Sequence, residues 1–230
     1  MGRFTGLIGV AVILAIGFVL CPTRRRIDLR VIGAALVLQF ALAWACLSFP
    51  PFVRLFDLLA EGFNRVVGFA DEGSNFVFGR ALNDPTGPWG FVFAVRVLPT
   101  IVFFASLMAV LYHLRIMQPL VAGIAWLLRR SLRVTGVEAL SAAANIFLGQ
   151  TEAPLRVKPY IATMTRAQLM AVMVPGFSSI AGSVLAAYIG ILGGTDEASR
   201  ILFAKHLMTA SLMSAPAGLL MARLMLPETE

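Results

Sequence analysis

The sequence predicts an all-α integral membrane protein with spanning helices, one re-entrant helical hairpin and one broken helix. Three observations predict this class. First, the 230 residues are 59% hydrophobic and only 13% charged, with a mean hydropathy of +0.85, which exceeds the apolar content of a soluble domain. Second, apolar runs long enough to span a bilayer alternate with short charged segments. Third, a polar block at residues 145–154 separates two apolar arms that are each too short to span.

The first two spans are predicted at residues 4–21 and 31–49. The first is expected to be a retained helix, because its basic cluster follows the apolar run, the reverse of a secretory signal. The positive-inside rule places the loop between the two spans in the cytoplasm and the N-terminus outside. The basic residues that decide this are Arg24, Arg25, Arg26 and Arg30.

The next three segments differ in their apolar patterns. Residues 50–88 carry apolar side chains at helical intervals, which predicts an external loop containing an amphipathic helix at the membrane surface. Residues 89–114 predict a third span, in which Arg96 either extends toward the interface or lines a polar path. Residues 119–133 end in too much charge to span, so we expect a helix along the cytoplasmic interface.

The polar block predicts the tip of a re-entrant hairpin with arms at residues 137–148 and 154–163. Gly149 permits a sharp change of direction, and Pro154 disfavours helix at the residue before it. Basic residues on both sides indicate that the hairpin enters and leaves on the cytoplasmic face. Non-helical backbone at membrane depth persists only where protein or a water-filled cavity satisfies its polar groups. The tip, Gln150-Thr151-Glu152, is therefore a candidate binding site.

A broken helix is predicted at residues 167–192, because the segment 175–183 interrupts it with proline, glycine and serine. A last helix at residues 200–225 returns inward. Broken helices leave carbonyls and amides unpaired at mid-membrane, where transporters hold a cation and a polar solute.

An enzyme is not expected. His113 and His206 are predicted near opposite membrane faces, so neither can activate Ser179 as a nucleophile. Nucleic acid is not expected as a partner, because the basic residues lie between apolar runs, where they set topology.

The chain resembles the concentrative nucleoside transporter family through an ordered set of motifs that covers most of its length. It differs in having Pro175 where the family usually has a more flexible residue, and in lacking the second, inverted half that follows the Pro-Glu-Thr-Glu segment. The motifs are Val97-Leu98-Pro99-Thr100, Leu111-Tyr112-His113-Leu114, the block from Leu140 to Leu155 with Asn145 and Gly149-Gln150-Thr151-Glu152-Ala153-Pro154, Lys158-Pro159-Tyr160, Ile180-Ala181-Gly182-Ser183-Val184 and Ser214-Ala215-Pro216-Ala217.

The resemblance implies one half of an inverted-repeat transporter. Residues 1–115 would be N-terminal scaffold helices with the external amphipathic loop. Residues 116–230 would be the first transport repeat, made of the interfacial helix, the re-entrant hairpin 137–163, the broken helix 167–192 and the helix 200–225. The implied assembly is a homotrimer, multi-pass in the cell inner (plasma) membrane and surrounded by membrane lipid.

The resemblance also implies sodium-coupled nucleoside uptake, with the chain expected to be an incomplete N-terminal part that needs the missing second half as partner. A proton-coupled nucleoside symporter and a non-transporting truncated relic remain the alternatives. Sodium, the coupling ion, is the only ion implied, and no cofactor is. Nucleobase contacts would come from Gln150 and Thr151, from Glu152 through water and from Val184 by packing. The sodium ligands would be the side chains of Asn145 and Ser179 and the carbonyls of Leu148 and Ile180.

Overall fold

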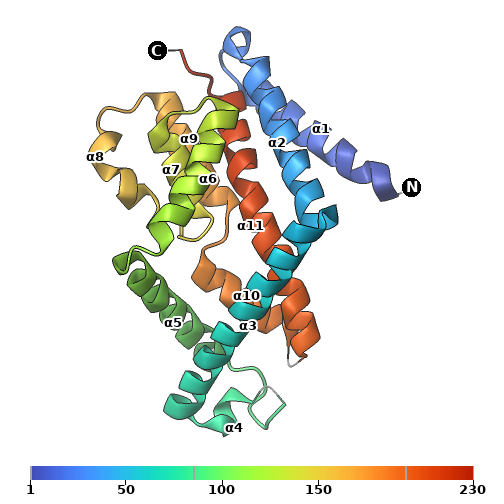
Figure 1. The fold of residues 1–230 in the computed structure, drawn as a ribbon, viewed down its shortest axis with the longest axis vertical. Coiled ribbons are helices and arrows are strands. Elements are labelled where there is room, and N and C mark those ends of the chain that lie inside the picture. The colour runs from blue at the N-terminus through green and yellow to red at the C-terminus, as the bar shows by residue number, and fades with distance from the viewer. Residues whose placement is uncertain (1, 85, 195, 230) are drawn as a thin grey trace. The chain divides into compact units, whose positions relative to one another are not determined.

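The protein is helical almost throughout, and the prediction of an all-α chain is confirmed (Figure 1). The computed structural model describes residues 2–84, 86–194 and 196–229, with no strand among them. The elements are α1 (Gly2–Leu20), η1 (Arg24–Arg26), α2 (Leu29–Ser48), α3 (Pro50–Phe78), α4 (Arg80–Asn83), α5 (Phe93–His113), α6 (Met117–Leu132), α7 (Gly136–Asn145), η2 (Pro154–Val157), α8 (Lys158–Ile161), α9 (Arg166–Ser178), α10 (Gly182–Gly193) and α11 (Glu197–Met225).

Four described stretches are long and apolar enough to cross a membrane: α2, α5, the stretch Arg166–Gly193 that contains α9 and α10, and α11. Part of α1, Thr5–Leu20, is a shorter apolar helix. These stretches correspond to the five expected apolar segments. The third begins later than the expected residue 89, because Gly90 has φ +60° and α5 starts only at Phe93. Which ends of these helices face the cytoplasm stays a prediction, and residue 195, between the fourth and fifth expected segments, lies outside the described residues.

The helix expected within residues 50–88 is α3, which runs for 29 residues. It ends at Gly79, whose φ of +81° is a conformation that favours glycine. Its buried residues form one stripe at helical spacing, so one face packs on protein; its placement at the membrane surface stays a prediction. The stripe is Phe56, Ala60, Val67, Ala70 and Ser74.

Two compact units make up the chain. The first contains Met1–Leu42, Val121–Ser179 and Met213–Glu230; the second contains Ala43–Leu120 and Ile180–Leu212. The sequence predicts another division, into scaffold helices at residues 1–115 and a transport repeat at residues 116–230. That division concerns transport function and stays a prediction.

In the second unit, α3 packs against α5 and α10. The rings of Phe63 and Phe104 stack with centroids 4.8 Å apart, beside Val67 and Ala186. A neighbouring cluster joins α3 and α10 to α11 through small and branched side chains, which lets the backbones approach closely. Its buried members are Ala60, Leu185, Ile189 and Ala204.

Ion pairs connect α11 to α3 within the second unit. Lys205 Nζ lies 2.6 Å from Asp57 Oδ1, and Arg200 Nη1 lies 3.3 Å from Asp71 Oδ2. Before the first turn of α11, the Asp196 carboxylate accepts hydrogen bonds from the Ser199 hydroxyl and backbone N–H. These bonds, the hydroxyl first, hold the pKa of Asp196 below its usual range.

In the first unit, α7 and α9 pack together, and each begins with a capping box. Thr135 and Glu138 exchange hydrogen bonds at the start of α7, and Thr165 and Gln168 do the same at the start of α9. The two helices are thus started by the same local chemistry, with a carboxylate in one box and an amide in the other.

The carboxylate of Glu138 has a second partner, Arg223 near the end of α11. Arg223 Nη2 donates to both carboxylate oxygens, at 2.7 and 2.9 Å, and Nη1 donates to Glu228 at 3.2 Å. The Thr165 hydroxyl donates to the same Glu228 oxygen at 3.1 Å. Glu138 is fully buried. We call Arg223, Glu138, Glu228 and Thr165 the basal clamp, because they connect the first turns of α7 and α9 to the end of α11.

The second arm of the expected hairpin, residues 154–163, contains two four-residue helical pieces, η2 and α8. Pro154 and Pro159 explain the division, because each lacks the backbone N–H that a continuing helix needs and sits at the first turn of a new one. One sequence expectation is wrong: the break in the fourth apolar segment is narrower than residues 175–183, because Pro175 lies inside α9 and only Ser179–Ala181 are non-helical.

Gly218 lies where α11 packs closely against α9. A Cβ at this position would lie 2.8 Å from Ser178 Oγ and 2.9 Å from Pro175 Cα. We expect Gly218→Ala to destabilise the protein by about 1–3 kcal/mol, because backbone must shift. Gly123→Ala in α6, where a Cβ meets nothing within 4 Å, is the control and should be neutral or stabilising by up to about 1 kcal/mol. Thermal unfolding of the detergent-solubilised variants measures both, and equal behaviour would contradict the packing.

Removing one partner of the Arg223–Glu138 ion pair should destabilise the protein more than removing both partners. Arg223→Gln leaves a buried carboxylate without its cation, at a cost of about 3–5 kcal/mol. Glu138→Gln keeps the capping box, since Gln168 fills that role in α9, so it isolates the ion pair from the cap. The double variant should be more stable than Arg223→Gln alone. Arg166→Gln, an exposed arginine of α9, is the control, and strictly additive losses in thermal unfolding would refute a direct pair.

Candidate functional site

The most unusual side chain in the first unit is Asn145, the last residue of α7. It is 0% exposed, and neither its Oδ1 nor its Nδ2 has a hydrogen-bond partner among the described residues. A buried polar group without a partner costs about 1–3 kcal/mol. Such a group in a folded protein calls for a ligand, an ion or a water molecule.

The chain turns immediately after Asn145. The N–H of Leu148 donates to the carbonyl of Ala144 at 2.8 Å, and the N–H groups of Glu152 and Ala153 both donate to the carbonyl of Gly149, at 3.0 and 3.1 Å. The last carbonyls of a helix have no partner in the next turn and carry the negative end of the helix dipole. The end of α7 therefore presents oxygen atoms next to a buried amide, a suitable environment for a cation.

Gln150, Thr151 and Glu152 lie together in this turn and are exposed in the described structure. Gly149 is not among the glycines with positive φ, so the turn is made without the left-handed conformation that glycine would allow. That these three exposed side chains form the tip of a re-entrant hairpin and bind a solute stays a prediction.

Helix α9 approaches this turn at Gly176, which the sequence indicated only as part of the helix break. A Cβ on Gly176 would lie 3.1 Å from Gln150 Cβ and 3.6 Å from Asn145 Oδ1. A larger residue would displace the turn, so Gly176 allows Asn145, Gln150 and α9 to meet. The sequence signal was the glycine after Pro175, because small residues occur where helices approach closely.

Ser179 follows the end of α9 and belongs to the same unit. Its hydroxyl donates to the carbonyl of Pro175 at 2.9 Å, and its backbone N–H donates to the same carbonyl at 3.2 Å. The hydroxyl proton is therefore used within the helix end, which leaves the oxygen lone pairs free to accept or to bind a cation.

The remaining two expected site residues belong to the second unit. Ile180 is half-buried and packs against the cluster around Leu185 and Ile189. Val184 is half-buried in the first turn of α10. The first unit thus carries Asn145, Leu148, Gln150, Thr151, Glu152 and Ser179 on two segments that meet at Gly176. That these six residues form one binding site stays a prediction.

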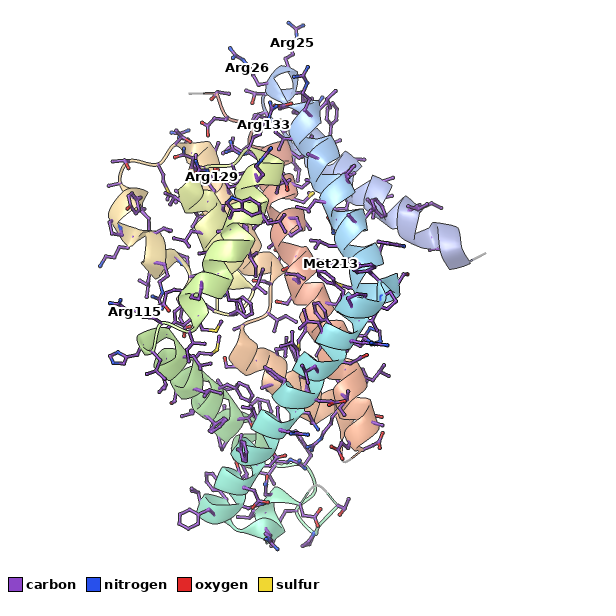
Figure 2. The ribbon with its side chains drawn as sticks, viewed as in Figure 1. Arg25, Arg26, Arg115, Arg129, Arg133 and Met213 are labelled. Carbon is purple, nitrogen blue, oxygen red and sulfur yellow. The ribbon has the colours of Figure 1, made fainter. Side chains whose placement is uncertain are left out.

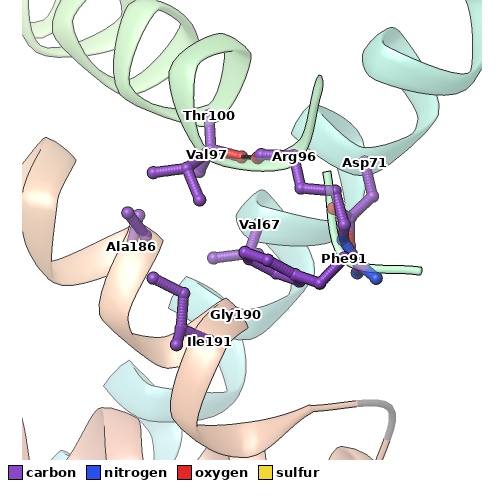
Figure 3. A pocket seen from close by; sticks show the side chains of 10 residues that line it. Val67, Asp71, Phe91, Arg96, Val97, Thr100, Ala186, Gly190 and Ile191 are labelled. Carbon is purple, nitrogen blue, oxygen red and sulfur yellow. Dashed lines mark hydrogen bonds between the residues drawn. The ribbon is translucent and has the colours of Figure 1, made fainter. Parts of the chain in front are cut away.

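A small cavity in the second unit has a different character (Figure 3). Its lining includes Asp71, Phe91, Arg96 and Thr100, with Arg96 5.9 Å from the centroid of the Phe91 ring. Its volume of ≈ 10 Å³ admits about one water molecule. It is far too small for a nucleoside, and Arg96 is a half-buried wall residue of this cavity.

The predicted ion ligands, the side chains of Asn145 and Ser179 and the carbonyls of Leu148 and Ile180, are all neutral oxygens. Within the described parts of the chain, no three His, Cys, Asp or Glu side chains gather as metal ligands. Amide, hydroxyl and carbonyl oxygens suit a hard monovalent cation better than a transition metal.

Two family models match the chain: "Na+ dependent nucleoside transporter N-terminus" over residues 8–81 and "Nucleoside recognition" over residues 94–195. An uncharacterized transporter of Haemophilus influenzae is 44% identical over 230 residues, which is 100% of this chain and 53% of that protein. Sodium/nucleoside cotransporter 1 of Sus scrofa is 39% identical over 222 residues, 96% of this chain and 32% of that protein.

A solved structure of the transporter CNTnw, in an inward-facing, substrate-bound state, superposes with a TM-score of 0.88 at 43% identity. It covers 97% of this chain, and the chain covers 52% of it. The chain thus spans about half the length of the bacterial relative and of this solved structure, and about a third of the mammalian relative. With motifs, fold and both family models in agreement along its length, the chain belongs to the concentrative nucleoside transporter family.

Proposed function

We propose that this chain supplies one half of a sodium-coupled nucleoside symporter in the cell inner (plasma) membrane. The observation that carries the proposal is Asn145, whose fully buried side chain has no partner in the described structure and lies next to the turn that bears Gln150. A coupling cation would satisfy the buried amide oxygen, and a solute at the turn would lie close to it.

In this proposal the sodium ion is bound by the side-chain oxygens of Asn145 and Ser179 and the carbonyls of Leu148 and Ile180. These neutral oxygens offset the loss of the ion's hydration shell without burying an opposite charge. A bound sodium ion also gives the buried Asn145 side chain a partner, so ion binding and the geometry of the turn are energetically linked. The pig relative is described as a sodium cotransporter, which agrees with sodium as the coupling ion.

The nucleoside is proposed to bind at the hairpin tip. The Gln150 amide and the Thr151 hydroxyl offer donors and acceptors to a base edge, Glu152 reaches the base through water, and Val184 packs against it. Val184 and Ile180 come from the second unit, and the rest from the first. The whole transporter is proposed to be a homotrimer in which the segment 137–163 re-enters the membrane.

Proton coupling is the second candidate, and the exposed carboxylate of Glu152 at the tip favours it. A carboxylate that binds a proton during transport would couple uptake to the proton gradient in place of the sodium gradient.

We expect the 230-residue chain by itself to take up no nucleoside. Transporters of this type hold the solute between two repeats, so one hairpin and one broken helix supply only one wall of the cavity. Uptake of labelled uridine into proteoliposomes, with and without a sodium gradient, tests this, and co-reconstitution with the second half from a relative is the positive control. Sodium-driven uptake by the chain alone that Gln150→Ala abolishes would contradict the expectation.

Asn145→Ala and Gln150→Ala should separate ion coupling from solute recognition when this chain is reconstituted together with the second half from a relative. The first removes an ion ligand and should raise the sodium concentration for half-maximal uptake by roughly tenfold or more, with little change in which bases are accepted. The second should change apparent nucleoside affinity and leave sodium dependence intact. Uptake that follows a pH gradient and ignores sodium in the unsubstituted protein would decide for proton coupling.

A further inference from the structure

The formal charge of the protein is concentrated in its first unit. This unit holds twelve of the nineteen Lys and Arg residues and five of the twelve Asp and Glu residues, whereas the second unit holds seven of each. The entire formal net charge of +7 therefore belongs to the first unit. The positive-inside rule accounts for which side of the membrane such charge occupies, but not for whether it binds anything.

The acidic side chains of the first unit do not neutralise its exposed arginines. Glu138 and Glu228 are both paired with Arg223 in the basal clamp. Asp28 accepts the backbone N–H of Arg30 at 2.9 Å. Several exposed arginines of this unit, among the residues that the structure describes, have no carboxylate within ion-pair distance. Six of them lie within residues 25–30 and 129–133, and we call these six the arginine cluster: Arg25, Arg26, Arg30, Arg129, Arg130 and Arg133.

The arginine cluster comes from two segments that are about a hundred residues apart in the sequence. One runs from the connection between α1 and α2 into the first turn of α2, and the other is the end of α6 with the residue that follows it. Figure 2 shows Arg25, Arg26, Arg129 and Arg133 toward the same end of the first unit. Arg133 follows α6 with a φ of +51°, a conformation that favours glycine at this position. An arginine in that place suits the negative end of the helix dipole and projects a cation beyond the helix end.

Exposed apolar side chains flank the cluster. Trp126 on α6 is 67% exposed and Leu29 at the start of α2 is 77% exposed, and α2 is a candidate membrane span. Tryptophan, apolar side chains and basic residues in sequence are typical of an element at the membrane–water interface. If the apolar side chains beside the cluster contact the hydrocarbon of the bilayer, the phosphates within reach of the arginines are those of lipid headgroups. A soluble anion or a nucleic acid would not bring hydrocarbon to these side chains.

We propose that the arginine cluster binds the phosphate headgroups of anionic phospholipids. Arginine presents a planar fork that donates two parallel hydrogen bonds to one phosphate, which lysine cannot do. Groups of four to eight basic residues next to a membrane span, or on an amphipathic helix, have the density needed to retain anionic lipids. This inference concerns lipid recognition and does not depend on sodium or nucleoside binding.

The test is lipid retention by the purified, detergent-solubilised protein. The probe is dioleoyl phosphatidylglycerol, compared with the zwitterionic dioleoyl phosphatidylcholine, and bound lipid per protein is counted by native mass spectrometry. We expect preferential retention of phosphatidylglycerol, and at least about a tenfold loss of that preference in the variant Arg25→Gln/Arg26→Gln/Arg129→Gln/Arg133→Gln. Arg54→Gln/Arg65→Gln, two exposed arginines of α3 in the second unit, is the control and should leave the preference unchanged.

Two further measurements use the unsubstituted protein and test the proposal even if the quadruple variant does not insert into the membrane. Retention by the unsubstituted protein should fall steeply between 50 mM and 500 mM NaCl, because the Debye length shortens from about 14 Å to about 4 Å over this range and weakens the attraction between exposed charges. Millimolar inorganic phosphate at constant ionic strength should not displace the lipid. Equal retention of both lipids, salt-independent retention, an equal loss in the control variant, or full displacement by free phosphate would each overturn the proposal.

Discussion

The ion pair between Arg223 and Glu138 is the interaction on which the first unit depends. A fully buried carboxylate is unfavourable unless its charge is opposed and its oxygens accept hydrogen bonds. Here the guanidinium opposes the charge, while the Thr135 N–H and hydroxyl donate to Oε2 at 2.7 and 2.9 Å. One carboxylate therefore both starts α7 and attaches it to α11, so the position of α7 along its axis is set from its first turn.

The consequence reaches the other end of α7. Asn145 ends a helix of ten residues, so any shift of the first turn moves the unpaired amide by the same amount relative to Gly176. Helix α9 is positioned by the same clamp through Thr165 and Glu228. The proposed ion ligands are thus placed by polar contacts at one end of the two helices. Close packing at Gly176 sets the distance between α9 and the turn after α7, and close packing at Gly218 sets the distance between α9 and α11.

The two units accommodate their charged side chains in different ways. The second unit balances its charges and uses them between helices, as in the pairs Lys205–Asp57 and Arg200–Asp71. The first unit buries its paired carboxylate and leaves arginines exposed at one end. Charges between helices hold the fold together, whereas unpaired charges at a membrane surface are available to lipid.

The sequence by itself determined the all-α membrane class, the approximate spans, the helix in residues 50–88 and the turn that bears Gln150, Thr151 and Glu152. Hydropathy, helical periodicity and proline and glycine positions are local signals, and they depend little on distant residues. Only the tertiary structure decided that Gly176 contacts Gln150, that Asn145 is buried without a partner, and that Arg223 pairs with Glu138 across 85 residues. These are non-local contacts: a sequence shows that a carboxylate or an amide is present, but packing decides what surrounds it.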